Sequence, residues 1–129
     1  MLTRICSYVE SIEGVFTLYV DDMTISSKNP IDSKKIASKV GKIMQDFGHT
    51  LSKNKTKYYS KYDFKYVTGV IISPNHQLLV PNRLSFKIKK ELKYVNSIEY
   101  SYGKSTSARL NGLLQAARAI QQNYRINIM

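Results

Sequence analysis

The chain has 129 residues, of which 43% are hydrophobic and 22% charged, and this composition suits one globular domain, or one domain with a small appendage. No run of about 18 apolar residues is present, which excludes a transmembrane helix, and Glu10 and Glu13 interrupt the apolar segment that a signal peptide needs. The net charge is +11 and the single cysteine, Cys6, cannot form an internal disulfide, so we expect a soluble, cytoplasmic protein.

The first predicted elements are a short helix and a β-hairpin. Apolar residues recur at three- and four-residue steps and predict a helix that Gly14 ends; they are Leu2, Ile5, Cys6, Val9 and Ile12. The alternating pattern of residues 15–20 predicts a strand. Asp21 and Asp22 interrupt the apolar pattern, and residues 23–26 resume it. The two aspartates are therefore expected at the tip of a hairpin.

A second helix is predicted next. Pro30 suits its first turn, with Asn29 as the N-terminal cap. Gly48 is a natural C-terminal stop. The helix has a continuous apolar stripe on one face, made of Ile36, Val40, Ile43, Met44 and Phe47. This stripe and the Gly48 stop together predict the helix.

A second hairpin is predicted after an extended segment over residues 49–59. Residues 64–72 and 77–80 are rich in β-forming side chains. Between them, residues 73–76 read Ser-Pro-Asn-His, which is typical of a turn. We therefore expect two strands joined at this turn.

The pattern becomes helical after Pro81. One side of the first helix carries Leu84, Ile88, Leu92 and Val95. A polar loop over residues 97–106 precedes a last helix, whose stripe is Leu110, Leu113, Leu114, Ala117 and Ile120. We place the boundary near Pro81, so that residues 1–81 form an α+β part and residues 82–129 a helical part.

The charge is distributed unevenly along the chain. Residues 1–28 carry a net charge of −2, residues 29–48 of +2, and residues 49–129 of +11. This pattern fits a polyanion held beside a cation-binding carboxylate site. A solvated, solubilising surface explains the charge equally well. A membrane partner is disfavoured, because the basic residues do not lie opposite one clean apolar stripe.

The two neighbouring aspartates carry most of the chemical information. Asp21 and Asp22 are poor β-formers and repel each other when ionised. A magnesium ion would offset that repulsion, because this hard cation prefers carboxylate and phosphate oxygens. Strands that hold carboxylates rigidly suit two-metal phosphoryl transfer. The alternative is an ordinary polar turn.

A resemblance follows from these residues and their order. Tyr-Val-Asp-Asp at 19–22, between two hydrophobic strands, resembles the palm-domain active-site hairpin of reverse transcriptases, and the Thr-Ile-Ser-Ser at 24–27 resembles the retron and group II intron branch. Further segments resemble retron enzymes in the same order along nearly the whole chain: Leu51–Thr56 with its Lys-Thr, Val67–Gly69, and the thumb-like Leu110–Arg125.

The resemblance implies an α+β fold, in which a partial polymerase palm of antiparallel hairpins packed with helices is followed by a helical thumb. It implies that Asp21 binds catalytic magnesium and that Asp22 supports it as the second catalytic and metal-binding residue. Tyr19 would lie near the primer end. Lys55 would contact the triphosphate or protonate the leaving pyrophosphate, although a solvated lysine is the alternative.

The resemblance also implies nucleic-acid contacts in the thumb. Basic side chains there would lie along duplex phosphates and give affinity without reading sequence; they are Lys87, Lys90, Arg109 and Arg118. Tyr94, Tyr100 and Tyr102 would stack on bases or contribute to a core. The partners would be an RNA template, a DNA primer and deoxynucleotides.

The catalytic set is incomplete in this chain. The family has a further palm aspartate and the fingers upstream of the hairpin. Here the only acidic residues before the hairpin are Glu10 and Glu13. We therefore expect no polymerisation by the chain alone, activity in combination with the missing fingers and palm portion, and self-association through exposed apolar surface. The alternatives are a non-catalytic basic module that binds RNA or duplexes and, less favoured, a palm-like nucleotidyl cyclase.

Overall fold

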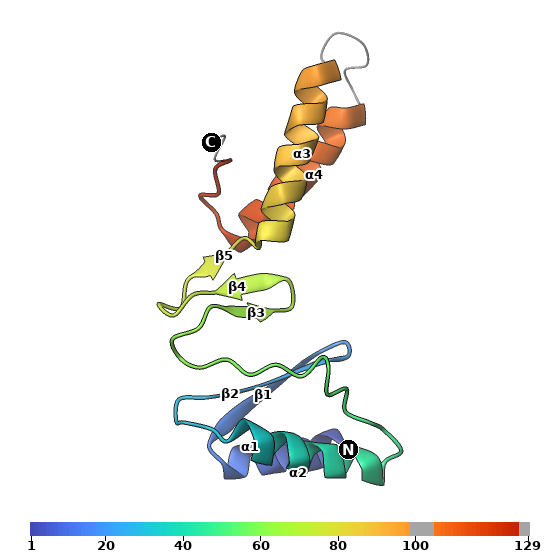
Figure 1. The fold of residues 1–129 in the computed structure, drawn as a ribbon, viewed down its shortest axis with the longest axis vertical. Helices are drawn as coiled ribbons and strands as arrows, with labels where there is room; N and C mark the ends of the chain where they lie inside the picture. The colour runs from blue at the N-terminus through green and yellow to red at the C-terminus, as the bar shows by residue number, and fades with distance from the viewer. Residues whose placement is uncertain (99–104, 127–129) are drawn as a thin grey trace. The chain divides into compact units, whose positions relative to one another are not determined.

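The computed structural model describes residues 1–98 and 105–126 (Figure 1). Within these residues the chain is α+β, with four helices and two small antiparallel sheets, as predicted. It divides into two compact units, Met1–Tyr58 and Tyr59–Met129. The prediction that a palm part gives way to a thumb part at Pro81 is a different division and stays a prediction. No helix in the described ranges has the length and apolar character needed to cross a membrane.

The first unit has the order helix, hairpin, helix. Helix α1 spans Leu2–Ser11, strand β1 Gly14–Tyr19, strand β2 Asp22–Ser27 and helix α2 Ser33–Asp46. Both helices and the hairpin are therefore confirmed. Val20 lies in the turn and not in the strand where it was predicted.

The predicted cap of α2 is wrong. Asp32 is the N-cap, because its Oδ1 accepts hydrogen bonds from the backbone N–H groups of Lys34 and Lys35, both at 3.1 Å. Asn29 instead donates from Nδ2 to Glu13 Oε2 at 2.9 Å. A carboxylate directly before the first turn satisfies two otherwise unpaired donors, so the helix begins three residues later than Pro30 suggests.

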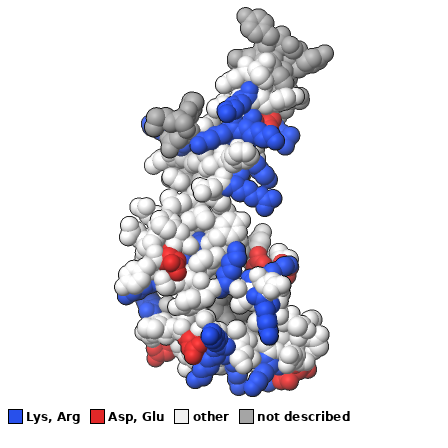
Figure 2. Space-filling view, in the orientation of Figure 1, with Lys and Arg blue, Asp and Glu red and all other residues white. Residues whose placement is uncertain are grey.

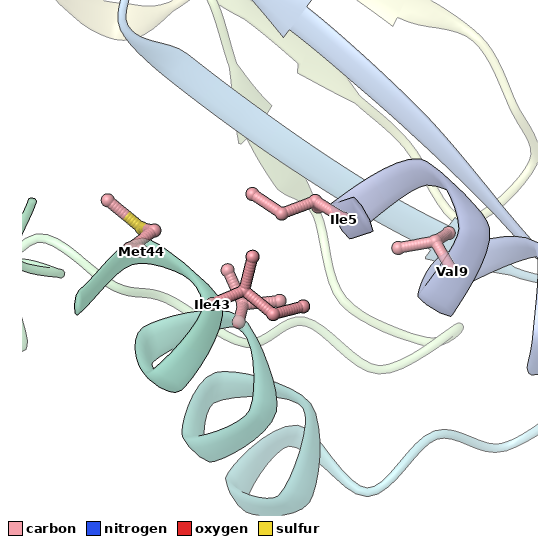
Figure 3. Packing of buried hydrophobic residues seen from close by; sticks show 5 residues of the cluster. Ile5, Val9, Ile43 and Met44 are labelled. Atoms are coloured by element: carbon pink, nitrogen blue, oxygen red, sulfur yellow. The ribbon is translucent and has the colours of Figure 1, made fainter. Parts of the chain in front are cut away.

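The core of the first unit joins both helices to one face of the hairpin. Its buried residues are Ile5, Val9, Val40, Ile43 and Met44, and Figure 3 shows side chains of α1 and α2 gathered in one cluster. Phe16 and Ile25, which are directly opposed in the hairpin, pack against this cluster. The other face of the hairpin is therefore turned away from the core.

The second unit begins with a three-stranded meander. Strand β3 spans Lys65–Val67, β4 Val70–Ile72 and β5 Leu78–Leu79. The single strand predicted over residues 64–72 is wrong, because the chain reverses at Thr68 and Gly69. Their φ angles are +46° and +85°, and two consecutive positive φ angles are what a type I′ hairpin turn requires.

The turn and the two helices predicted for the second unit are confirmed, whereas both ends of the predicted loop over 97–106 belong to helices. The turn over residues 73–76 is closed by the Ser73 N–H, which donates to the Gln77 carbonyl at 2.9 Å. Helix α3 spans Asn82–Ile98 and α4 spans Ser105–Ile120, and their buried core residues are Ile88, Leu110 and Ala117. Within the predicted loop over 97–106, Tyr100 and Tyr102 lie outside the described residues.

The segment predicted to be extended over residues 49–59 contains a turn. The Thr56 N–H donates to the Ser52 carbonyl at 3.1 Å, and the Thr56 hydroxyl donates to the same oxygen at 2.8 Å. The local Ser-to-Thr hydrogen bonds compete with an extended backbone, and this explains the difference.

Gly14 provides the first test of this packing. A Cβ at Gly14 would lie 2.9 Å from Val9 Cγ1 and 3.2 Å from the Ser26 carbonyl oxygen. Because Val9 is fully buried and the oxygen is backbone, neither can move easily. We expect Gly14→Ala to lower the free energy of unfolding by about 1–3 kcal/mol in urea titrations.

Gly41→Ala is the matched control for this substitution. Gly41 lies in α2, and a Cβ there meets nothing within 4 Å. We expect the control to raise the free energy of unfolding by about 0.5–1 kcal/mol, since alanine is the better helix former. Equal effects of the two substitutions would contradict the close approach at Gly14.

Candidate functional site

The tip of the first hairpin is a two-residue turn. Tyr19 and Asp22 form the last antiparallel pair, and Val20 and Asp21 connect them. The φ angle of Val20 is +56°. A positive φ at the first central position is what a type II′ turn requires, and glycine is the usual residue there.

Val20 is therefore strained. A β-branched side chain in this region of the Ramachandran map is a genuine outlier and carries about 1–3 kcal/mol of strain. The Val20 side chain is also 81% exposed, so the strain is not offset by burial. Such strain is concentrated at functional sites, which makes this turn a candidate site on conformational grounds.

The outward face of the hairpin presents an aromatic ring beside a carboxylate. Directly opposed residues of an antiparallel pair lie on the same face, so Tyr19 and Asp22 are neighbours. Phe16 and Ile25 lie on the inward face. Because side chains alternate along a strand, Tyr19 and Asp22, which lie three positions from Phe16 and Ile25, are on the outward face. Tyr19 is 67% exposed and both aspartates are exposed. The site is thus open to a large ligand.

Asp21 and Asp22 differ from the other three aspartates. Asp32 caps α2, Asp46 pairs with Arg4 at 2.9 Å, and Asp63 accepts a hydrogen bond from the Ser60 N–H at 2.7 Å. Within residues 1–98 and 105–126, neither Asp21 nor Asp22 has a hydrogen bond or ion pair from a protein side chain. Two adjacent carboxylates without a structural role suit an external cation.

The carboxylate of Asp63 has a structural explanation. The pKa of Asp63 is lowered from its ordinary value of 3.8, first by the backbone hydrogen bond from Ser60 and then by the Ser60 hydroxyl. Lys65 lowers it further, against the opposing effect of desolvation. This acid fixes the turn before β3, so its shift does not indicate a second site.

The donors at the hairpin tip fit magnesium only in part. Magnesium is usually held by one or two carboxylates together with waters and substrate phosphates. Asp21 and Asp22 supply the two carboxylates. In the described part of the chain, no group of three or more His, Cys, Asp or Glu side chains is placed to hold a metal. The remaining ligands would come from water, a substrate or another chain.

Lys55 lies in the same unit as the hairpin but in a separate segment of the chain. It is exposed, in the turn between Ser52 and Thr56. Among the described residues it makes no ion pair with Asp21 or Asp22. Its predicted contact with a nucleotide stays a prediction.

The predicted nucleic-acid contacts lie on the two long helices of the second unit. Lys87 and Lys90 are exposed on α3, and Arg109 and Arg118 are exposed on α4. Basic side chains gather over these helices on the face shown in Figure 2. The arrangement gives the second unit a surface suited to a polyanion.

Arg109 has a structural partner that the sequence analysis missed. Its Nε lies 3.7 Å from Glu91 Oε2, and the Glu91 side chain is only 12% exposed. Glu91 falls between Ile88 and Leu92 of the apolar stripe, and an acid inside such a stripe was the available signal. Arg109 therefore helps to hold α4 against α3.

An open groove near the start of α3 was also missed. Its volume is about 360 Å³, and its lining includes Tyr66, Arg83 and Lys87. It joins an aromatic ring of β3 to two cations of α3. Lys87 is the only one of these that the sequence analysis singled out.

No protein-family model matches the chain.

Replacing Val20 tests the strain in the turn. Because glycine adopts positive φ freely, we expect Val20→Gly to raise the free energy of unfolding by about 1 kcal/mol. Val15→Gly is the matched control, since Val15 is an exposed β1 residue, 59% accessible, paired with Ser26. We expect the control to lower stability by about 0.5–1 kcal/mol. Similar losses in both variants, measured by urea unfolding, would argue against a strained turn.

The ion pair between the helices gives a separate prediction. Arg109→Met leaves the nearly buried Glu91 carboxylate without its cation, and we expect it to lower the free energy of unfolding by about 1–2 kcal/mol. This loss is smaller than that expected for a fully buried ion pair, because solvent screens the exposed arginine. Lys90→Met, on the exposed face of α3, is the control and should change stability by less than about 0.5 kcal/mol.

A double-mutant cycle sharpens this test. In a Glu91→Gln background, Arg109→Met should have little further effect, because no buried charge remains to be compensated. An unchanged loss in that background would assign the stabilisation to packing of the arginine stem.

Proposed function

We propose that the chain is the palm and thumb portion of a retron-type reverse transcriptase, an RNA-directed DNA polymerase. One observation carries the proposal: Asp21 and Asp22 stand exposed at the tip of a strained two-residue turn, without protein partners in the described part of the chain. In this assignment, residues 1–81 belong to the palm and residues 82–129 to the thumb.

The chemistry assigned to the hairpin is magnesium-dependent nucleotidyl transfer. Magnesium would neutralise charge that develops on the phosphates and orient the reacting oxygens. Asp21 supplies the main carboxylate and Asp22 the second one. The rigid inner face of the hairpin holds both in place, which reduces the reorganisation needed when substrate arrives. Tyr19, on the same face as Asp22, supports the primer end.

The rest of the catalytic set comes from the missing part of the palm and the fingers. In the described residues, the first sheet has only two strands, so β1 and β2 each keep one edge without a strand partner. Such edges accept a further strand. A strand that added there and carried an aspartate near the tip would complete a three-carboxylate site. The exposed Val15 and Tyr19 also favour self-association in its absence.

Substitution of the aspartates tests the proposal through metal binding. We expect Mn²⁺, added with a deoxynucleoside triphosphate, to broaden the NMR signals of backbone amides at residues 19–22 of the full chain. Asp21→Asn should remove this broadening, because its carboxylate supplies the main ligand, and Asp22→Asn should weaken it. Glu10→Gln, an exposed acid in α1, is the charge-matched control and should leave it unchanged.

Activity provides the second readout. The chain alone should not extend a DNA primer on an RNA template, whereas mixing it with a polypeptide that contains the missing fingers and palm aspartate should. Asp21→Asn should reduce the complemented rate by at least about a hundredfold, on the scale of losing one electrostatic contact to the transition state. Complemented activity that is insensitive to Asp21→Asn would disprove the assignment.

A non-catalytic module that binds RNA or duplexes is the second candidate. It is favoured by the absence, within the described residues, of a third carboxylate near the pair. If the chain is such a module, its duplex binding should depend on salt and should not change with either aspartate substitution. Mn²⁺ should then not broaden the amide signals of the hairpin. The metal measurement therefore separates the two candidates.

A further inference from the structure

A basic groove lies between the two helices of the first unit. It has a volume of about 360 Å³ and is lined by Tyr8 of α1 and by Lys35, Ser38, Lys39 and Lys42 of α2. The three lysines follow at steps of four and three residues, so they share one side of the helix. None of these five residues has a role in the hairpin site.

The lysines of this groove form no ion pair with the acids at the two ends of α2. Asp46, near the end of α2, is engaged by Arg4 at 2.9 Å, and Asp32 accepts two backbone hydrogen bonds at the start of the helix. Over residues 1–98 and 105–126, no ion pair involves Lys35, Lys39 or Lys42. Like charges at these spacings destabilise a helix by about 0.2–0.5 kcal/mol per pair. A bound anion would relieve that repulsion.

The lysine row is long enough to face more than one phosphate. Seven residues of α-helix rise about 10 Å, and one strand of B-DNA advances about 3.4 Å per phosphate along the duplex axis. A row lying parallel to that axis therefore covers the axial length of about three phosphates. Tyr8 packs against the core of the unit, so this part of the groove lining is held in place. We propose that the groove between α1 and α2 binds the phosphate backbone of a nucleic-acid strand.

This contact is separate from the catalytic proposal. The groove belongs to the helices, whereas Asp21 and Asp22 stand at the hairpin tip. Binding there holds a strand against the first unit without reading its sequence. It is expected whether or not the hairpin binds metal, so either proposal can fail without the other.

Lysine footprinting tests the site directly. The full chain is acetylated with and without a 20-base-pair RNA duplex, and the modification of each lysine is measured by mass spectrometry. Lys35, Lys39 and Lys42 should be protected severalfold more strongly than Lys34, which lies on the same helix but does not line the groove. Uniform protection of all four lysines would overturn the proposal.

Charge-matched variants give the second measurement. Lys35→Gln, Lys39→Gln and Lys42→Gln combined should lower duplex affinity by on the order of tenfold at low salt, and should reduce the slope of log K against log salt by about 2–3. The control combines Lys34→Gln, Lys53→Gln and Lys57→Gln and should reduce the slope by less than about 1. Equal effects of the two triple variants would overturn the proposal. Protection of the groove lysines by phosphatidylserine vesicles but not by RNA would overturn it in favour of a membrane surface.

Discussion

The hairpin site depends on the burial of one face of β1 and β2 against α1 and α2. Phe16 and Ile25 pack on the cluster formed by Ile5, Val9 and Ile43. Because side chains alternate along a strand, burial of this face determines which residues face outward. A shift of the strand register by one residue would exchange the inward-facing and outward-facing side chains. Tyr19 and Asp22 are held outward by packing at the other end of the strands. Apolar burial thus sets the direction of a polar site.

The turn itself is held in a conformation that its sequence does not favour. Val20 carries positive φ without the freedom of glycine, and at the second hairpin turn Thr68 does the same beside Gly69. The strain at Val20 is sustained only because the six paired positions of β1 and β2 fix the two ends of the turn. A relaxed turn would let Asp21 sample many positions. A strained one narrows that range, which would lower the conformational entropy lost on binding of the proposed cation.

Periodic patterns made most of the fold predictable. The stripe of α2 from Ile36 to Met44 and that of α3 from Leu84 to Val95 both predicted the helices, because burial of one face outweighs weak local preferences. Phe47, predicted in the first stripe, lies past the end of α2 and is 47% exposed. Local hydrogen bonding explains the misses. The Asp32 cap, the Ser52–Thr56 turn and the reversal at Thr68 each depend on a few polar or backbone bonds that hydrophobic periodicity does not report.

The two candidate sites also differ in how far they can be predicted from the sequence. Neighbouring aspartates between two strands can be read directly from sequence, because hairpin geometry brings adjacent residues to one tip. The α1–α2 groove cannot, because Tyr8 and Lys39 are 31 positions apart and meet only after the core has formed. The lysines also resemble an ordinary solvated helix face until their neighbours are known. Asp46 pairs with Arg4 and Asp32 caps the backbone of α2, so neither acid forms an ion pair with the groove lysines. The proposed binding of an anion therefore depends on how these acids are used as much as on the lysines themselves.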